Sequence, residues 1–227
     1  MKPAPRQLAL DLPVETRFGR EDFLVSPSNA QAWETFENWP AWPDRVLLLL
    51  GPTGAGKTHL AAIWAARTKA RVLSATALPL ADLPGLVRAP AILVEDADNA
   101  PQVETELFHL LNLVRTSDAF LVLTARQWPD NWGLVTPDLL SRLRLAPAVE
   151  IGEPDDALVR AVLVKLFIDR QLVVDTSVVE YLALRIERSL DAAQVVVEAL
   201  DREALAQRRP ITRPVAAEVL RRLDSGE

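Results

Sequence analysis

The clearest chemical pattern in the sequence is a glycine-rich run, Gly51-Pro52-Thr53-Gly54-Ala55-Gly56-Lys57-Thr58. Its glycines permit backbone conformations in which successive amide groups turn inward and surround a phosphate. The spacing fits a phosphate-binding loop, in which Lys57 would contact the outer phosphates and the Thr58 hydroxyl would bind Mg²⁺. The run therefore predicts that ATP or ADP, together with Mg²⁺, binds to the residues from Gly51 to Thr58.

Two acids, Glu95 and Asp96, directly follow the apolar run Ala91-Ile92-Leu93-Val94. In a phosphate-loop protein one carboxylate at this place binds Mg²⁺, usually through water, and the next polarises the attacking water. Position assigns the metal to Glu95 and the water to Asp96. Because Asp96 is the shorter acid, it would reach less far toward that water, so the sequence predicts slow intrinsic turnover.

Three more residues could act on a nucleotide. Thr124 ends another apolar run, where a polar side chain can orient water or sense the terminal phosphate. Arg142 follows, where an arginine could reach the nucleotide of a neighbouring subunit and stabilise the transferring charge. Arg188, expected on a C-terminal helix, could contact the terminal phosphate of this chain. Their order along the chain after a phosphate loop, more than their residue types, indicates that they act on a nucleotide.

The elements that must position these residues follow an alternating pattern. Residues 18–153 predict an α/β domain with a parallel, doubly wound sheet, because apolar runs alternate with helical patterns. The predicted strands are 46–50, 71–75, 91–94, 119–124 and 145–151, and the predicted helices are 29–38, 59–68 and 104–115. Residues 154–227 predict a small all-helical domain, with helices at 155–171, 175–186, 190–208 and 213–223. The phosphate loop lies between a buried strand and a helix, as its chemistry requires.

The amino-acid composition excludes several classes of protein. The 227 residues are 49% hydrophobic and 25% charged, a balance typical of soluble globular proteins. Cysteine is absent, which excludes disulfides and thiolate metal sites, and two histidines are too few for a histidine-rich metal site. Without a long apolar run or a signal peptide, the sequence predicts a cytoplasmic protein with no membrane contact. The net charge of −6 argues against extensive unspecific contact with nucleic acid.

Residues 1–17 predict a flexible tail, since Pro3, Pro5 and Pro13 prevent a helix. Within the tail, Gln7 is followed by Leu8, Leu10 and Leu12, which share one face of an extended chain. The spacing alone leaves two interpretations open. The segment could pack on its own domain, or it could dock as a short linear motif in the groove of a partner.

Together these motifs resemble the AAA+ ATPases, and among them the DnaA group, over nearly the whole chain. Beyond the phosphate loop the resemblance rests on Phe23-Leu24-Val25, Ser28-Asn29-Ala30, Glu106-Leu107-Phe108-His109-Leu110-Leu111-Asn112, Ser141-Arg142-Leu143 and Glu187-Arg188-Ser189-Leu190. It implies an AAA+ core followed by a helical lid. It also implies that Asn29 belongs to the adenine side of the site, that Arg142 is an arginine finger acting in trans, and that Arg188 is a second sensor.

The expected layout lacks the helix-turn-helix domain and the N-terminal partner domain of DnaA. It is similar to the short DnaA-homologous regulators, which bind the sliding clamp through an N-terminal glutamine–leucine motif. The resemblance therefore implies that Gln7, Leu8, Leu10 and Leu12 bind the clamp. It further implies that the chain engages ATP-bound DnaA and promotes hydrolysis of that ATP through Arg142. Homo-oligomers are compatible with this reading, and DNA contact is expected at most indirectly through the clamp.

Three other functions remain open. A helicase loader or nucleic-acid-remodelling ATPase would need aromatic residues interleaved with cations, and no cationic stripe accompanies the six tryptophans. A non-catalytic adaptor would bind nucleotide without acting in trans. A small-molecule kinase would need a substrate lid between the core strands, and the four helices after the sheet argue against it.

Overall fold

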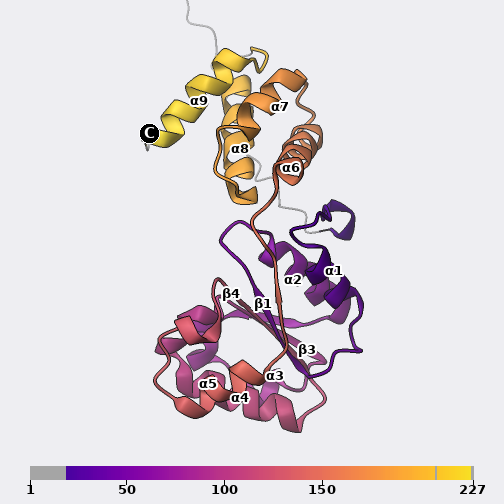
Figure 1. Cartoon of the computed structure of the whole chain (residues 1–227), viewed down its shortest axis with the longest axis vertical. Helices are drawn as coiled ribbons and strands as arrows, with labels where there is room; N and C mark the ends of the chain where they lie inside the picture. The colour runs from indigo at the N-terminus through magenta and orange to yellow at the C-terminus, as the bar shows by residue number, and fades with distance from the viewer. Residues whose placement is uncertain (1–18, 208, 226–227) are drawn as a thin grey trace, which may run out of the picture. The chain divides into compact units, whose positions relative to one another are not determined.

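The computed structural model describes residues 19–207 and 209–225. The contacts separate them into two compact units, one ending at Asp155 and the other beginning at Asp156. Strands and helices alternate in the first unit, and the second unit consists of helices (Figure 1). The leucine motif of the tail, with Gln7, Leu8, Leu10 and Leu12, lies outside the described residues.

The first unit is built on a parallel sheet with the strand order β2-β3-β4-β1-β5. Side chains of β1, β3 and β4 are buried almost throughout, as expected of strands that are covered on both faces. The strands, in chain order, are β1 Val46–Leu50, β2 Arg71–Ser74, β3 Ala91–Glu95, β4 Phe120–Ala125 and β5 Ala148–Glu150. This confirms the predicted α/β class and the parallel sheet.

Helices cover both faces of this sheet (Figure 1). Alternate residues of β1 point to opposite faces: Leu47 and Leu49 pack with α1 and α2, whereas Leu48 and Leu50 pack with α4 and α5. The helices of this unit are α1 Ala30–Glu37, α2 Lys57–Thr68, α3 Leu83–Leu86, α4 Glu104–Thr116 and α5 Pro137–Leu145. Short 3-10 helices lie at Arg20–Asp22, Ala75–Leu80, Ala97–Gln102 and Pro129–Asn131.

Two α-helices of this unit, the four-residue α3 and the longer α5, were not predicted. Residues from Pro137 form α5, where the predicted elements include no helix. Proline is well tolerated at the first position of a helix because that position needs no amide hydrogen. Leu139 and Leu143 then point into the core beside α4. Arg142 therefore lies on a helix that is packed against the sheet.

Most tryptophans belong to the core. Trp42 stacks on Trp64 with ring centroids 5.6 Å apart, and Trp39 packs edge-on against Phe120 at 5.7 Å. Trp132 is buried and donates its indole hydrogen to the carbonyl of Gln127. These rings are used in packing, which argues against their use as a platform for stacked bases.

The second unit contains the helices α6 Asp156–Asp169, α7 Thr176–Ala183, α8 Leu190–Gln207 and α9 Arg213–Ser225. This confirms the predicted small helical domain. Leu163, Phe167, Leu182 and Leu200 are among the side chains of its own apolar core. Glu203 of α8 is also buried, and it accepts hydrogen bonds from Arg222 of α9 at 2.7 Å and from Arg209 at 3.2 Å. These bonds join the last two helices.

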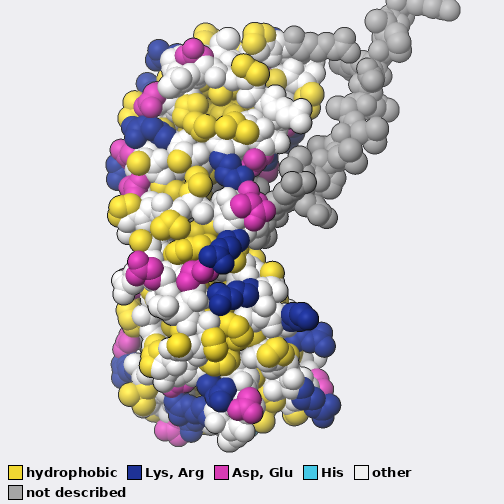
Figure 2. Space-filling view, turned by 90° about the vertical axis from the view of Figure 1, so that its right-hand side faces the viewer, with side chains coloured by type: hydrophobic (Ala, Val, Ile, Leu, Met, Phe, Trp, Pro, Cys, Tyr) yellow, Lys and Arg dark blue, Asp and Glu magenta, His cyan; other side chains and the backbone are white. Residues whose placement is uncertain are grey.

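Among the described residues, no helix is both long enough and apolar enough to cross a membrane. On the face shown in Figure 2, Lys and Arg side chains are interspersed with Asp, Glu and hydrophobic side chains.

Candidate nucleotide-binding site

The phosphate loop connects the end of β1 to the start of α2, near the middle of the sheet. The Gly51 amide donates to the Ala125 carbonyl of β4 at 3.2 Å, and the neighbouring Ile151 amide donates to the Leu50 carbonyl at 2.8 Å. Gly51 has φ of 152°, and a Cβ there would lie 2.4 Å from the carbonyl oxygen of Ile151. Only glycine fits at this position, so the beginning of the loop is fixed by the sheet.

The rest of the loop curls around the N-terminus of α2. Gly54 and Gly56 have φ of 69° and 99°, the left-handed region that favours glycine. Gly56 is the N-cap residue and provides no capping side chain, so the first amides of α2 remain directed toward the loop. The helix dipole adds partial positive charge at this end. This geometry is suited to phosphate oxygens.

Lys57 supplies the charge of the loop. Its side chain is 9% exposed, and Nζ donates to the carbonyl oxygens of Gly51 at 2.7 Å and Pro52 at 2.9 Å. A nearly buried ammonium requires such partners. The hydrogen bonds hold Lys57 over the start of the loop, where the outer phosphates of a nucleotide would lie.

The two acids at the end of β3 have different surroundings. Glu95 is partly buried beside Thr58, and Asp96 is exposed. Burial raises the pKa of Glu95, the charge of Asp96 raises it further, and the hydrogen bond from the Thr58 side chain opposes both. The structure thus brings together Thr58 and Glu95, the two residues that the sequence assigns to Mg²⁺.

Thr124 is buried at the end of β4, and its Oγ1 accepts a hydrogen bond from the Asp96 amide at 3.1 Å. Asp96 itself has φ of 54°, which is uncommon for a residue other than glycine. The Thr124 hydroxyl therefore holds the backbone at the place where the chain leaves β3. The sequence analysis assigned Thr124 to water or phosphate, and the structure gives it this supporting contact.

Sequence reasoning missed an ion pair beside these acids. Arg126, two residues beyond Thr124, donates from Nε to Oδ2 of Asp98 at 2.5 Å. The Asp98 side chain is only 7% exposed, and the charges of both Asp98 and Asp96 act on Arg126. Because β3 and β4 are adjacent and parallel, the residues that follow them emerge at one edge. The contact follows from this strand pairing, which the structure shows.

Asn29 is buried directly before α1, and both ends of its amide are used. Nδ2 donates to the Leu24 carbonyl at 3.0 Å, and Oδ1 accepts from the Ser26 amide at 2.9 Å. Phe23 in the same segment stacks on Trp33 with centroids 5.1 Å apart. Asn29 thus fixes the shape of the segment that the resemblance places on the adenine side.

Arg142 of α5 is partly buried against α4. Its Nη1 donates to Oδ1 of Asn112 at 2.5 Å, and its guanidinium carbon lies 4.9 Å from the centroid of the Phe108 ring. Glu104, at the start of α4, accepts from the amides of Val135 and Thr136 at 2.8 Å each. These contacts with α4 hold the start of α5 and the side chain of Arg142.

Arg188 belongs to the second unit. It lies in the connection before α8, not on a helix as the sequence analysis expected, because α7 ends at Ala183 and α8 begins at Leu190. Ser189 interrupts the helical pattern, since its hydroxyl accepts from the Ala192 amide at 3.4 Å at the start of α8. Arg188 forms an exposed ion pair with Asp156 of the same unit at 3.0 Å.

A nucleoside diphosphate or triphosphate with Mg²⁺ fits the residues present. Gly51 to Thr58 offer amides, one ammonium and a hydroxyl, and Glu95 offers a carboxylate. No group of three or more metal-binding side chains occurs among residues 19–207 and 209–225. This donor set suits Mg²⁺, which typically takes one or two protein ligands and completes its shell with phosphate oxygens and water.

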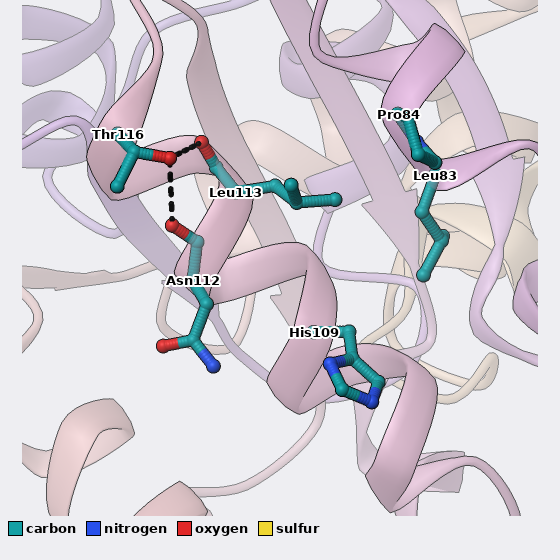
Figure 3. Close-up of a pocket in the computed structure, with 6 residues that line it drawn as sticks. All are labelled: Leu83, Pro84, His109, Asn112, Leu113 and Thr116. Atoms are coloured by element: carbon teal, nitrogen blue, oxygen red, sulfur yellow. Dashed lines mark hydrogen bonds between the residues drawn. The ribbon is translucent and has the colours of Figure 1, made fainter.

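Two hollows of similar size lie in the first unit. One, of about 400 Å³, lies beside α2 and includes Thr58 and Glu95 together with Ala62, Ala65, Val72 and Leu93. The other, of about 430 Å³, lies between α3 and α4 (Figure 3). It is lined by Leu83, Pro84, His109, Asn112, Leu113 and Thr116, with Leu113 directed toward α3. The first adjoins the candidate metal ligands, whereas the second is mainly apolar.

Comparison with known proteins gives one family-model match and several similar structures. Residues 156–220 match the family model described as the lid domain of Hda. A comparison with curated protein sequences found no match. Domain III of the replication initiation protein DnaA from Thermotoga maritima is similar in structure, with a TM-score of 0.76, 18% identity, and coverage of 92% of this chain and 98% of that one.

Two further structures are similar to this chain. AMPPCP-bound DnaA from Aquifex aeolicus has a TM-score of 0.66 at 21% identity, covering 83% of this chain and 68% of that one. A RuvB variant from Thermotoga maritima has a TM-score of 0.68 at 17% identity, with coverages of 86% and 67%. The chain thus has the fold of DnaA domain III, and residues 156–220 of its second unit are similar to the Hda lid domain.

Proposed function

We propose that this DnaA-like AAA+ chain, which carries an Hda-type lid, binds ADP or ATP with Mg²⁺ and acts with the sliding clamp to promote hydrolysis of DnaA-bound ATP. That hydrolysis would inactivate the initiator and so restrain chromosomal replication initiation in the cytoplasm. The observation that carries the proposal is the match of residues 156–220 to the Hda lid, joined to an AAA+ core. DnaA and the clamp are the proposed partners, and self-association is a further proposal.

In this proposal the chain's own nucleotide is held by the phosphate loop. The amides of Gly54 to Thr58 would bind phosphate oxygens, and Lys57 would contact the outer phosphates. Thr58 and Glu95 would hold Mg²⁺, which supplies positive charge that offsets that of the phosphates. Asp96 is exposed, and its reach is short, so the nucleotide would serve mainly to organise the protein. Arg188 of the lid would add a contact to the terminal phosphate.

Arg142 would act on the nucleotide of DnaA. The charge that spreads over the transferring phosphate is best stabilised by a planar guanidinium that is already oriented. Asn112 and Phe108 support Arg142 from α4, and its side chain remains partly exposed. A preformed support of this kind reduces the entropy that is lost when the contact with DnaA forms.

The clamp would be bound by Gln7, Leu8, Leu10 and Leu12. Alternate side chains of an extended peptide can fill successive pockets of a preformed groove. This attachment would raise the local concentration of the chain near DnaA on DNA, since two linked contacts make the second one effectively intramolecular.

The test is single-turnover hydrolysis by ATP-loaded DnaA, mixed with the purified chain, with or without clamp loaded on DNA. We expect rapid hydrolysis only when chain and clamp are both present. A variant with Gln7, Leu8 and Leu10 all replaced by alanine should lose clamp binding and stimulation but keep its own nucleotide. If the chain with clamp leaves the rate of DnaA unchanged, the proposed function is wrong, and a nucleotide-gated adaptor becomes the better explanation.

A further inference from the structure

Arg126 leaves the sheet beside the phosphate loop. It directly follows β4, and β4 pairs with β1 so that Ala125 lies opposite Leu50. The Gly51 amide donates to the Ala125 carbonyl at 3.2 Å. Adjacent strands lie about 4.8 Å apart, so the backbone of Arg126 is roughly one strand spacing from the first residue of the loop. The side chain is 53% exposed.

Asp98 holds the guanidinium through a single atom. The contact is made by Nε of Arg126 and Oδ2 of Asp98. For both Nη groups of Arg126, no hydrogen bond is found within the described part of the chain. The second carboxylate oxygen, Oδ1, is buried and likewise has no hydrogen-bond partner among the described residues. Because an unpaired buried carboxylate is strongly unfavourable, Asp98 keeps Arg126 in place while its Nη groups remain available to another acceptor.

A second arginine, Arg45, pairs with an aspartate in front of β1 and β4 and provides a contrast. Arg45 and Asp118 precede β1 and β4 and pair at the opposite edge of the sheet. Arg45 uses Nη2 for the Asp118 carboxylate at 2.9 Å and Nη1 for the Asp118 carbonyl at 2.7 Å, and it lies 5.3 Å from the Phe120 ring. Arg45 therefore has both Nη groups engaged, as expected of a purely structural pair, whereas Arg126 is held only through Nε.

We propose that Arg126 contacts the terminal phosphate of a nucleoside triphosphate bound in this chain, with Asp98 as the positioning residue. The inference rests on the proposed nucleotide site. It adds a contact made in cis that ADP cannot engage fully, because ADP lacks the third phosphate. Arg126 would then make the chain discriminate between the triphosphate and diphosphate states of its own ligand.

Calorimetric titration of the full chain with Mg²⁺ and either AMPPCP or ADP tests this. Arg126→Gln keeps hydrogen-bonding capacity without charge, and we expect AMPPCP affinity to fall about tenfold or more while ADP affinity changes less than about twofold. Asp98→Asn should reduce AMPPCP affinity by a smaller factor, because the guanidinium remains but is less well oriented. Arg45→Ala is the matched control and should leave both affinities unchanged.

The outcomes separate the two proposals. If the unmodified chain binds neither nucleotide, the proposed nucleotide site itself is wrong. If it binds both and Arg126→Gln changes neither affinity, or lowers both equally, Arg126 does not read the third phosphate and the inference is overturned. The double variant Asp98→Asn, Arg126→Gln removes both charges and guards against misfolding caused by an unpaired Asp98. It should show the same selective loss of AMPPCP affinity.

Discussion

The phosphate-loop edge and the α4–α5 face belong to the same unit but position their cations in different ways. Lys57 is held by carbonyls only five and six residues away in the chain. Arg142 is held by Asn112, 30 residues away, and the start of α5 is held by Glu104 across 31 and 32 residues. The first arrangement is local backbone geometry, whereas the second depends on the packing of two helices.

This difference predicts that damage to one region spares the other. A change in the phosphate loop should strongly weaken nucleotide binding and leave α5 in place. A change at the α4–α5 contact should alter what Arg142 can do and leave nucleotide affinity unchanged. Variants in each region test this separation.

Arg142→Ala should have the largest effect. An arginine finger acting in trans is worth on the order of 10³–10⁵ in rate, so stimulated hydrolysis on DnaA should nearly disappear. Arg142→Lys should also fail, because an ammonium lacks the planar set of donors. Single-turnover hydrolysis measures the loss, and calorimetry should give unaltered ADP affinity.

Arg144→Ala is the matched control for this helix. Arg144 pairs with Asp130 on the exposed side of α5, so its removal should matter much less. Full stimulation by a folded Arg142→Ala variant would refute the finger assignment. A fall in melting temperature with no selective effect on hydrolysis would assign Arg142 to packing alone.

Lys57→Ala should reduce nucleotide affinity by about a hundredfold, because charge-assisted hydrogen bonds to the outer phosphates are each worth about 1.5–3 kcal/mol. The stabilisation that a bound ligand provides by mass action should decrease accordingly at a given ADP concentration. Thermal melting with and without saturating ADP measures this. An unchanged ADP-induced rise in melting temperature would show that the loop does not bind phosphate in the expected way.

Glu104→Gln tests the α4–α5 contact. The neutral amide loses one of the two acceptors that bind the Val135 and Thr136 amides, so the free energy of unfolding should fall by about 1–3 kcal/mol. Nucleotide affinity should not change. Denaturant unfolding measures the effect, and Glu106→Gln on the same helix is the control. Equal stability of the two variants would mean that Glu104 does not anchor α5.

Acid should weaken the same contact gradually. Burial alone would raise the pKa of Glu104, but hydrogen bonds from the Thr136 side chain and from the Val135 and Thr136 amides outweigh it and lower the pKa from 4.5. A carboxyl group whose pKa is lower in the folded state stabilises the fold at pH values above its unfolded-state pKa. This stabilisation is lost as the pH falls through its folded-state pKa. The stability difference between the unmodified chain and Glu104→Gln should therefore be constant near neutral pH and shrink below about pH 4.5. A difference that grows with acid would contradict this sign.

The elements that could be predicted from the sequence are those marked by patterns among neighbouring residues. Val46–Leu50 is an uninterrupted apolar run followed by glycines at fixed spacing, so the strand and the loop are both evident from neighbouring residues. The same holds for the lid, where four helical patterns follow one another. By contrast, Arg188 was expected on a helix although the predicted helices 175–186 and 190–208 leave it between them, and it lies in the connection before α8.

Contacts between distant residues explain what was missed. Helix α5 is short and begins with proline, and its packing against α4 compensates for its weak helical signal. The Arg126–Asp98 pair depends on β3 and β4 lying side by side, which the sequence does not state. Asn29 illustrates a third limit, since the resemblance placed it on the adenine side of the site but did not reveal that Leu24 and Ser26 engage its amide.

The place of β1 in the sheet has a consequence for hydrogen exchange. Leu48 donates to the Pro147 carbonyl on one side, and Leu50 and Gly51 are bonded to Ile151 and Ala125 on the two sides. An amide in a strand that is paired on both edges and covered on both faces exchanges with heavy water only when the whole unit unfolds. The amides of β1 should therefore be among the slowest in the chain, so the phosphate loop begins from an element that opens on the timescale of global unfolding.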